Sequence, residues 1–138
     1  MSDFRALLLT DLVDSTRLAR QLGDLANAEL WARHDRLARD LLAPRRGREI
    51  DKADGMLLIF ETAAEAVDYA LAYQRALAGM TPPLQARVGL HVGLVTLREN
   101  APEDVARGAK PIEVEGAAKA TAARVMATAL GGDRKSVV

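Results

Sequence analysis

Residues 85–95 constrain the fold of this chain more than any other segment, because two kinds of side chain alternate along them. Every second position is apolar, and the positions between carry small or polar residues; the first set is Val88, Leu90, Val92 and Leu94, and the second is Arg87, Gly89, His91 and Gly93. A period of two predicts a β-strand with one face packed against an apolar layer. The glycines on the other face lead us to expect close approach of another backbone or a second subunit.

Other segments supply neighbours for this strand. Residues 6–9 form a continuous apolar run, typical of a buried central strand, and residues 48–52 and 56–60 predict a hairpin that turns at 53–55. Helices are predicted at about residues 14–23, 26–42, 62–79 and 116–130, and residues 98–111 are predicted to form a loop. Thr62 and Glu65 have the spacing of a capping box. We expect the helix that they open to bury one stripe of side chains, Val67, Ala70, Leu71, Gln74 and Leu77.

This order of elements predicts an α+β fold. A β-α-β-β-α-β core is typical of a ferredoxin-like split βαβ sheet with helices packed mainly on one face. In that topology the first strand lies antiparallel beside the third, so its end meets the turn between the second and third strands. The length of 138 residues fits one domain, which we place at residues 1–132.

Composition excludes several classes of protein. The 19 basic and 19 acidic residues cancel, so no overall field favours nucleic acid or an anionic membrane. The chain has no cysteine, hence no disulfide framework and no thiolate metal site. No apolar stretch approaches the ~20 residues of a membrane span. We therefore expect a soluble, cytoplasmic domain without a nucleic-acid or membrane partner.

Two aspartates end predicted strands, Asp11 in LLLTDLVDST and Asp54 in EIDKADGMLLIF. The predicted topology brings these two strand ends together. Paired carboxylates suit divalent cations that bind a polyphosphate. The same residues would also serve as ordinary turn formers or helix caps. We favour a metal site.

Four segments, in order, resemble the class III adenylate/guanylate cyclase catalytic domain. They are TDLVDST at 10–16, DKADG at 51–55, RVGLHVGLV at 87–95 and EGAAKATAARVM at 115–126. The resemblance runs from about residue 4 to residue 132. It implies a homodimer with sites at the subunit interface, which convert a nucleoside triphosphate into a 3′,5′-cyclic monophosphate and pyrophosphate in signal transduction.

The resemblance also implies roles for residues near the first strand and the hairpin. Asp11 and Asp54 would bind two Mg²⁺ or Mn²⁺ ions, with the Leu12 carbonyl as a further ligand. Ser15 and Thr16 precede a helix N-terminus, where free N–H groups suit phosphates, although simple capping explains them almost as well.

Family members that use ATP read the adenine with a lysine four positions before the hairpin aspartate and an acidic residue before the last helix. Here that lysine position is Ile50, and Lys52 lies two positions along, on the same strand face if the strand is regular. Glu113 matches the acidic residue. This pair favours ATP over GTP, unless both are merely solvated charges.

The last helix departs from the family pattern. Arg124 matches the arginine that stabilises charge on the α-phosphate, but it would equally suit a surface arginine. The family's asparagine, one turn earlier, is Ala120 here, and Lys119 beside it points elsewhere on a helix. A catalytically impaired module for dimerisation or nucleotide sensing is therefore the main alternative, and a protein-binding module without nucleotide is a weaker one.

The remaining predictions concern two histidines and the C-terminal residues. We expect His34 to be solvated and His91 to lie in the core or an interface, without a catalytic role. Family members continue after the last helix with further strands, so the resemblance implies a C-terminally truncated domain. Residues 133–138, DRKSVV, are what one frame of a common short-read sequencing adapter encodes before a stop codon. We therefore expect a non-native tail there, and the alternative is a genuine short polar tail.

Overall fold

The computed structural model describes residues 2–52, 55–128 and 134–137. The elements follow in the order β1 (Ser2–Leu12), α1 (Ser15–Leu22), α2 (Asp24–Asp40), β2 (Arg48–Lys52), β3 (Gly55–Phe60), α3 (Ala63–Ala78), β4 (Ala86–Glu99), α4 (Pro102–Ala106), β5 (Ile112–Glu115), α5 (Ala118–Ala127) and β6 (Arg134–Val137), with a short 3₁₀ helix, Ala43–Arg45, before β2. In this part of the chain, none of the helices has the length and apolar character that a membrane span requires.

The sheet has the predicted topology. Its order is β2-β3-β1-β4-β5, and β1 runs antiparallel to both β3 and β4. The first four strands of this order are those of a ferredoxin-like split βαβ sheet, which confirms the predicted fold class. β6 pairs in parallel with β4, and this pairing does not test whether residues 133–138 are native.

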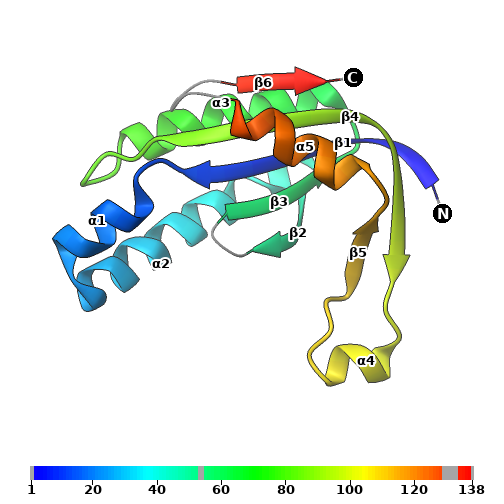
Figure 1. Ribbon diagram of the computed structural model, residues 1–138, viewed down its shortest axis with the longest axis horizontal. Helices are drawn as coiled ribbons and strands as arrows, with labels where there is room; N and C mark the ends of the chain where they lie inside the picture. The colour runs from blue at the N-terminus through cyan, green and yellow to red at the C-terminus, as the bar shows by residue number, and fades with distance from the viewer. Residues whose placement is uncertain (1, 53–54, 129–133, 138) are drawn as a thin grey trace.

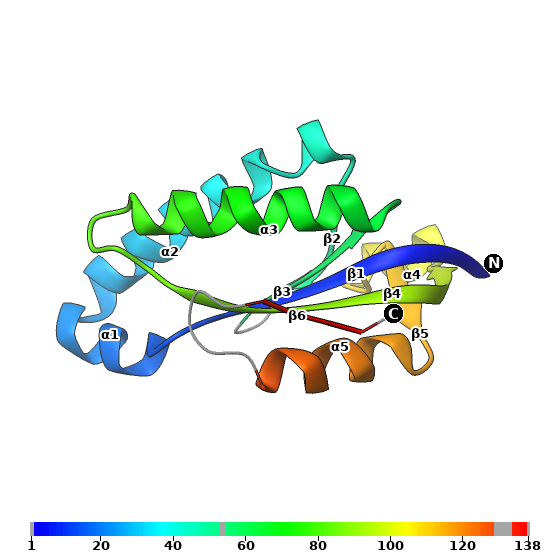
Figure 2. The ribbon, with the colours of Figure 1, turned by 90° about the horizontal axis from the view of Figure 1, so that it is seen from above.

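Helices cover the two faces of the sheet unequally (Figure 2). α2 and α3 pack on one face over an apolar layer that includes Leu8, Phe60 and Val88, while α5 alone packs on the other, over Leu7, Ile59 and Val95. The central strands carry apolar residues on both faces because both faces are covered.

The glycine-lined face of β4 faces α5. A Cβ at Gly89 would lie 2.5 Å from the carbonyl oxygen of Ala122 and 2.6 Å from the backbone nitrogen of Met126. Glycine is therefore required for α5 to lie this close to the strand. The predicted close approach of another backbone is confirmed, and the backbone belongs to the chain's own last helix.

The predicted loop at residues 98–111 is partly wrong, because residues 98–99 belong to β4 and Pro102–Ala106 forms α4, while residues 100–101 and 107–111 are neither helix nor strand. β4 continues to Glu99, and its residues Thr96–Glu99 pair with β5. Together with α4 these strands form an arm that projects from the domain (Figure 1). Pro102 stands in the first turn of α4, a position where proline favours helix formation. The loop was predicted only because the segment is rich in proline and charged residues, and paired strands at the edge of a sheet can have the same composition.

The capping box of α3 is confirmed, but its predicted inward face is partly wrong. Thr62 accepts a hydrogen bond from the Glu65 backbone, and the Glu65 carboxylate accepts one from the Thr62 backbone. Val67 and Leu71, expected inside, are each 37% exposed. The buried side includes Tyr69 and Tyr73 instead. A tyrosine can be buried when its hydroxyl has a partner, and the Tyr69 hydroxyl donates to the Ala38 carbonyl at 2.9 Å.

Candidate functional site

The candidate site lies where β1 ends between β3 and β4. Asp11 pairs across the sheet with Gly55 on one side and with Arg87 on the other. A Cβ at Gly55 would collide with the Thr10 carbonyl oxygen, so only glycine allows β1 to pass this close to the hairpin. Asp54, the residue before Gly55, lies outside the described residues. The predicted meeting of the β1 end with the hairpin is confirmed at backbone level.

A pocket of about 410 Å³ opens beside the Asp11 carboxylate. Three predicted groups line it together: Asp11 and Leu12 from the end of β1, and the Ser15–Thr16 pair from the start of α1. The remaining lining residues are Asp14, Arg17, Arg20 and Arg87. Three guanidinium groups and a helix N-terminus beside two carboxylates make the pocket suited to a phosphate chain.

Arg87 is the strongest partner that Asp11 has within the described structure. Its Nη2 atom donates to Asp11 Oδ2 at 2.7 Å, and the two side chains are 39% and 24% exposed. The Arg87 Nε atom is buried without a hydrogen-bond partner among the described residues. The rest of the Arg87 side chain is partly exposed beside the pocket, so its accessible guanidinium atoms can contact an anion without releasing the carboxylate.

A second pocket, of about 400 Å³, shares Asp11 and extends towards α5. Asp51 and Lys119 line it, and Lys119 Nζ lies 3.8 Å from Asp51 Oδ2. Lys110 from the arm lies 3.2 Å from the other Asp51 oxygen. Partial burial alone would raise the pKa of the Asp51 carboxyl, but the hydrogen bonds from Lys110 and the Lys52 backbone and the charges of both lysines lower it. Asp51 is therefore an ionised anchor for the arm and α5.

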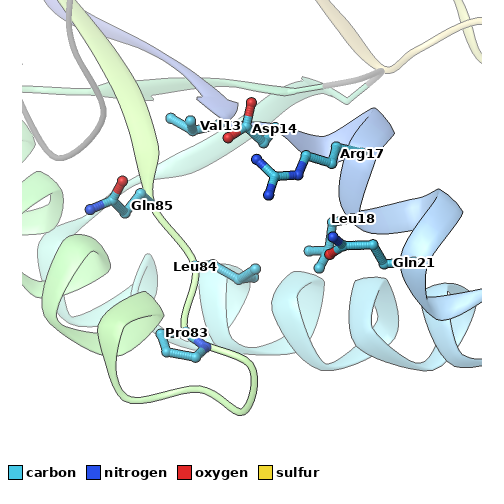
Figure 3. A pocket seen from close by; sticks show the side chains of 8 residues that line it. All are labelled: Val13, Asp14, Arg17, Leu18, Gln21, Pro83, Leu84 and Gln85. Atoms are coloured by element: carbon cyan, nitrogen blue, oxygen red, sulfur yellow. The ribbon is translucent and has the colours of Figure 1, made fainter.

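A third pocket, of about 330 Å³, lies on the other side of the β1–α1 turn. Figure 3 shows Arg17 extending from α1 below Asp14, towards the segment that carries Pro83, Leu84 and Gln85. Asp14 adopts a left-handed conformation with φ 57°, which aspartate tolerates better than most residues. Arg17 and Asp14 line this pocket and the Asp11 pocket alike.

Lys52 does not point where the sequence predicts. A β-bulge between Glu49 and Asp51 breaks the alternation of β2, so Ile50 packs in the α5 layer while Lys52 turns to the opposite face. There Lys52 Nζ lies 3.3 Å from Asp35 Oδ2 and 5.3 Å from the centre of the Trp31 ring. The prediction that Lys52 shares a face with position 50 is wrong, because a bulge reverses the parity of the strand.

Glu113 lies in the arm, far from Asp11. It pairs across the sheet with Arg98, whose Nη2 donates to the Glu113 carboxylate at 3.0 Å. Arg98 and Arg87 are 11 positions apart on β4, which corresponds to on the order of 30 Å along a strand. Glu113 and Asp11 of one chain therefore cannot contact the same small ligand.

Arg124 and Ala120 lie on the exposed side of α5, since Ala118 and Ala122 form its buried side. Arg124 Nη2 donates to Thr121 Oγ1 at 3.3 Å. The side chain of Arg124 thus points away from the Asp11 of its own chain's sheet and towards solvent.

No protein-family model matches this chain, and no curated protein does. Solved structures do match. An adenylate cyclase from Trypanosoma brucei superposes with a TM-score of 0.81 at 22% identity, over 95% of this chain and 71% of that one. The adenylyl cyclase CyaB from P. aeruginosa gives 0.83 at 16% identity, over 97% and 76%. The guanylyl cyclase domain of the RhoGC fusion protein from the aquatic fungus Blastocladiella emersonii gives 0.81 at 14%, over 97% and 79%.

This chain has the class III nucleotide cyclase fold. The fold-level resemblance inferred from the four sequence segments is confirmed. Both adenylate and guanylate cyclases superpose about equally well, so the cyclase fold does not distinguish between the two bases.

The donor set at the end of β1 fits Mg²⁺ or Mn²⁺ within this cyclase fold. Asp11 offers a carboxylate, and Leu12, which lines the same pocket, offers a backbone carbonyl. Both ions prefer oxygen ligands, and Mg²⁺ usually binds through one or two carboxylates, several waters and substrate phosphates. Within the described ranges no three His, Cys, Asp or Glu residues form a cluster that could hold a metal alone. A phosphate-bridged site is therefore the arrangement that the donors suit.

Three arginines of the site were missed by sequence reasoning. Arg17 and Arg20 follow one helical turn apart in α1, a spacing that indicates a shared face, but nothing in the sequence shows what that face meets. Arg87 could be assigned only from the register of β1 against β4.

His34 is buried, so the prediction of a solvated side chain is wrong. It is 2% exposed; its Nε2 lies 2.6 Å from the Tyr73 hydroxyl and its Nδ1 lies 2.9 Å from Asp35 Oδ1. The two partners satisfy both ring nitrogens, and this is what allows a polar ring in the core.

Acid is expected to destabilise the fold through His34. Burial lowers the pKa of His34 below its usual 6.5, although the hydrogen bond and the charge of Asp35 oppose this. The unfolded chain therefore binds the proton first as the pH falls, so the free energy of unfolding should decrease between about pH 7 and pH 5. Urea unfolding at several pH values measures this slope. In His34→Gln, which cannot take up the proton, the slope should be shallower, and equal slopes would contradict the assignment.

Proposed function

We propose that this chain is a nucleotidyl cyclase catalytic domain, which converts a nucleoside triphosphate into a 3′,5′-cyclic monophosphate and pyrophosphate. The observation that carries the proposal is the pocket beside Asp11, in which a predicted metal ligand, a helix N-terminus and three arginines meet. Adenylyl and guanylyl cyclases of known structure share the fold that forms this pocket.

The residues of the pocket have separate tasks in this reaction. Arg17, Arg20 and Arg87, with the first turn of α1, would bind the β- and γ-phosphates and balance the charge of the leaving pyrophosphate. The ribose 3′-oxygen would attack the α-phosphorus, the bond from that phosphorus to the bridging oxygen would break to release pyrophosphate, and the 3′-hydroxyl proton would pass to water in the open pocket. Two divalent ions held by Asp11, Asp54 and the Leu12 carbonyl would supply Lewis acidity to both oxygens.

A complete site in this proposal needs two copies of the chain. Glu113 and Arg124 lie too far from Asp11, or point away from it, to meet a ligand in the Asp11 pocket of the same chain. In a two-fold symmetric dimer, each copy would place its α5 and its arm against the metal-binding end of the other copy, so that two equivalent sites form. We therefore propose that the chain forms a homodimer. We also propose that this homodimer acts in signal transduction in the cytoplasm.

The proposal covers both ATP and GTP as the substrate. The prediction of ATP depended on Lys52 and Glu113, and Lys52 faces α2 and Asp35 instead of the Asp11 pocket. The Glu113 carboxylate would accept a hydrogen bond from an amino group of either adenine or guanine. The test must therefore offer both nucleotides.

The direct test is incubation of the purified chain with ATP or GTP and Mn²⁺, followed by mass spectrometry of the products. Cyclic AMP or cyclic GMP with stoichiometric pyrophosphate is the expected result. Linear nucleoside mono- or diphosphates as the only products would contradict the proposal.

An impaired domain that binds nucleotide without turnover is the second candidate. Two observations favour it: Ala120 offers no hydrogen-bond donor on the exposed side of α5, and Arg87 already neutralises Asp11. Metal-dependent binding of ATP without cyclic product would support this alternative.

A further inference from the structure

A line of polar side chains crosses the interior beneath the candidate site. At one end, Lys52 binds the Asp35 carboxylate at 3.3 Å and lies over the Trp31 ring. The other Asp35 oxygen lies 2.9 Å from Nδ1 of His34. Lys52 is the residue directly before positions 53–54, so this end of the line attaches to one side of the hairpin turn.

The line continues from His34 to the other side of the same turn. His34 Nε2 lies 2.6 Å from the Tyr73 hydroxyl, and the side chain of Thr10 lies close enough to the Tyr73 hydroxyl to lower its pKa, although burial raises that pKa more strongly. The Thr10 hydroxyl oxygen accepts a hydrogen bond from the Met56 backbone at 3.3 Å. Thr10 directly precedes Asp11, and Met56 follows the turn. We call Lys52, Asp35, His34, Tyr73 and Thr10 the polar line.

Each hydroxyl or ring N–H of the polar line can donate towards the Asp35 end, where the carboxylate accepts. Asp35 is an acceptor, so His34 Nδ1 carries the proton and Nε2 accepts from the Tyr73 hydroxyl. The Thr10 hydroxyl can then donate to the Tyr73 oxygen while accepting from Met56. No member is left unpaired, which makes such a buried network rigid.

We propose that the polar line positions the end of β1 and the strand residues on both sides of positions 53–54, and thereby fixes the Asp11 carboxylate for metal binding. The inference rests on the proposed function. Its members contact neither metal nor substrate, so His34 and Tyr73 are positioning residues. Three of the attached backbone positions, Lys52, Thr10 and Met56, lie within two residues of Asp11 or Asp54.

Tyr73→Phe is the sharpest test, because the chain offers a matched control. Tyr69 is one turn earlier on α3, is equally buried and stacks on Tyr73 at 5.7 Å, but its hydroxyl donates to Ala38 and not to the polar line. Both changes remove one buried hydroxyl, so both should lower stability by similar amounts. Only Tyr73→Phe should loosen the hairpin.

Two measurements on the full chain separate the variants. Hydrogen exchange should show the Met56 amide exchanging about tenfold faster in Tyr73→Phe than in Tyr69→Phe, relative to the core strands. Titration with Mn²⁺ in the presence of 3′-deoxy-ATP or 3′-deoxy-GTP, which cannot cyclise, followed by electron paramagnetic resonance, should show a Kd for protein-bound Mn²⁺ raised about tenfold in Tyr73→Phe only. Lys52→Met, which cuts the line at its other end, should act in the same direction and serves if Tyr73→Phe does not fold.

The outcomes are distinct. Equal exchange at Met56 and equal Mn²⁺ affinity in the two tyrosine variants would overturn the positioning role. Faster exchange in Tyr73→Phe, with no Mn²⁺ binding by the unaltered chain in the presence of either nucleotide, would uphold the role of the polar line at the hairpin and overturn the metal site of the proposed function.

Discussion

Asp11→Asn is expected to lower cyclic nucleotide production by about 10³-fold while leaving the fold intact. The substitution keeps the shape of the side chain but removes the negative charge that a divalent cation requires. Stabilisation of developing charge in a phosphoryl-transfer site accounts for roughly 10²–10³ in rate per group, and more where a metal is lost with it. The measurement is the initial rate of cyclic product from ATP and GTP at saturating Mn²⁺.

Asp40→Asn provides the matched control for this change. Asp40 is exposed at the end of α2 and lines none of the three pockets described above, so its loss of charge should leave the rate unchanged. Asp54→Asn is expected to match Asp11→Asn if the two carboxylates share the ions. A rate for Asp11→Asn within threefold of that of the unaltered chain would contradict the proposed role of Asp11 in metal binding.

The sheet could be predicted from the sequence because its signals are local. Period-two alternation in β4 and the apolar run in β1 need no knowledge of their neighbours, and the order of elements then limits the topology to very few choices. The arm could not be predicted in this way. Its strands pair with each other over Thr96–Glu99 and Ile112–Glu115, and β1 reaches only as far as Thr96, so the partner of most of this segment is itself distant in sequence.

The site was predictable where its residues are close in sequence. Asp11, Leu12, Ser15 and Thr16 line one pocket because a strand end and the following helix start are adjacent in space whatever the rest does. Lys52 was placed on the wrong face because a single bulge residue reverses every later side chain of a strand.

The buried tyrosines of α3 show a different limit. Periodicity favoured Val67 and Leu71 as inward residues, since hydrophobicity alone ranks them above tyrosine. The structure buries Tyr69 and Tyr73, whose hydroxyl groups find partners on α2. Those partners are the Ala38 carbonyl and His34, and neither can be paired with a tyrosine from sequence without knowing how α2 and α3 pack.

Ala120→Asn is expected to raise the rate of cyclisation by up to about 10²-fold. An asparagine there would lie one turn before Arg124 on the exposed side of α5 and would present an amide donor and acceptor to a ligand held by a partner copy. Because one missing donor costs roughly 10²–10³ in rate, restoring it should act mainly on kcat rather than on KM. Steady-state kinetics with Mn²⁺ and each nucleotide measures the two constants separately.

Ala127→Asn is the matched control, since Ala127 is exposed two turns later on the same helix and the substitution has a similar effect on helix propensity. It should leave kcat unchanged. In the double variant Ala120→Asn, Arg124→Ala the gain in kcat should disappear. The amide would still orient the ribose, but the guanidinium group that stabilises charge on the α-phosphate would be missing. A kcat for Ala120→Asn equal to that of Ala127→Asn would show that α5 does not face the reacting nucleotide, and the assignment of Arg124 would fall with it.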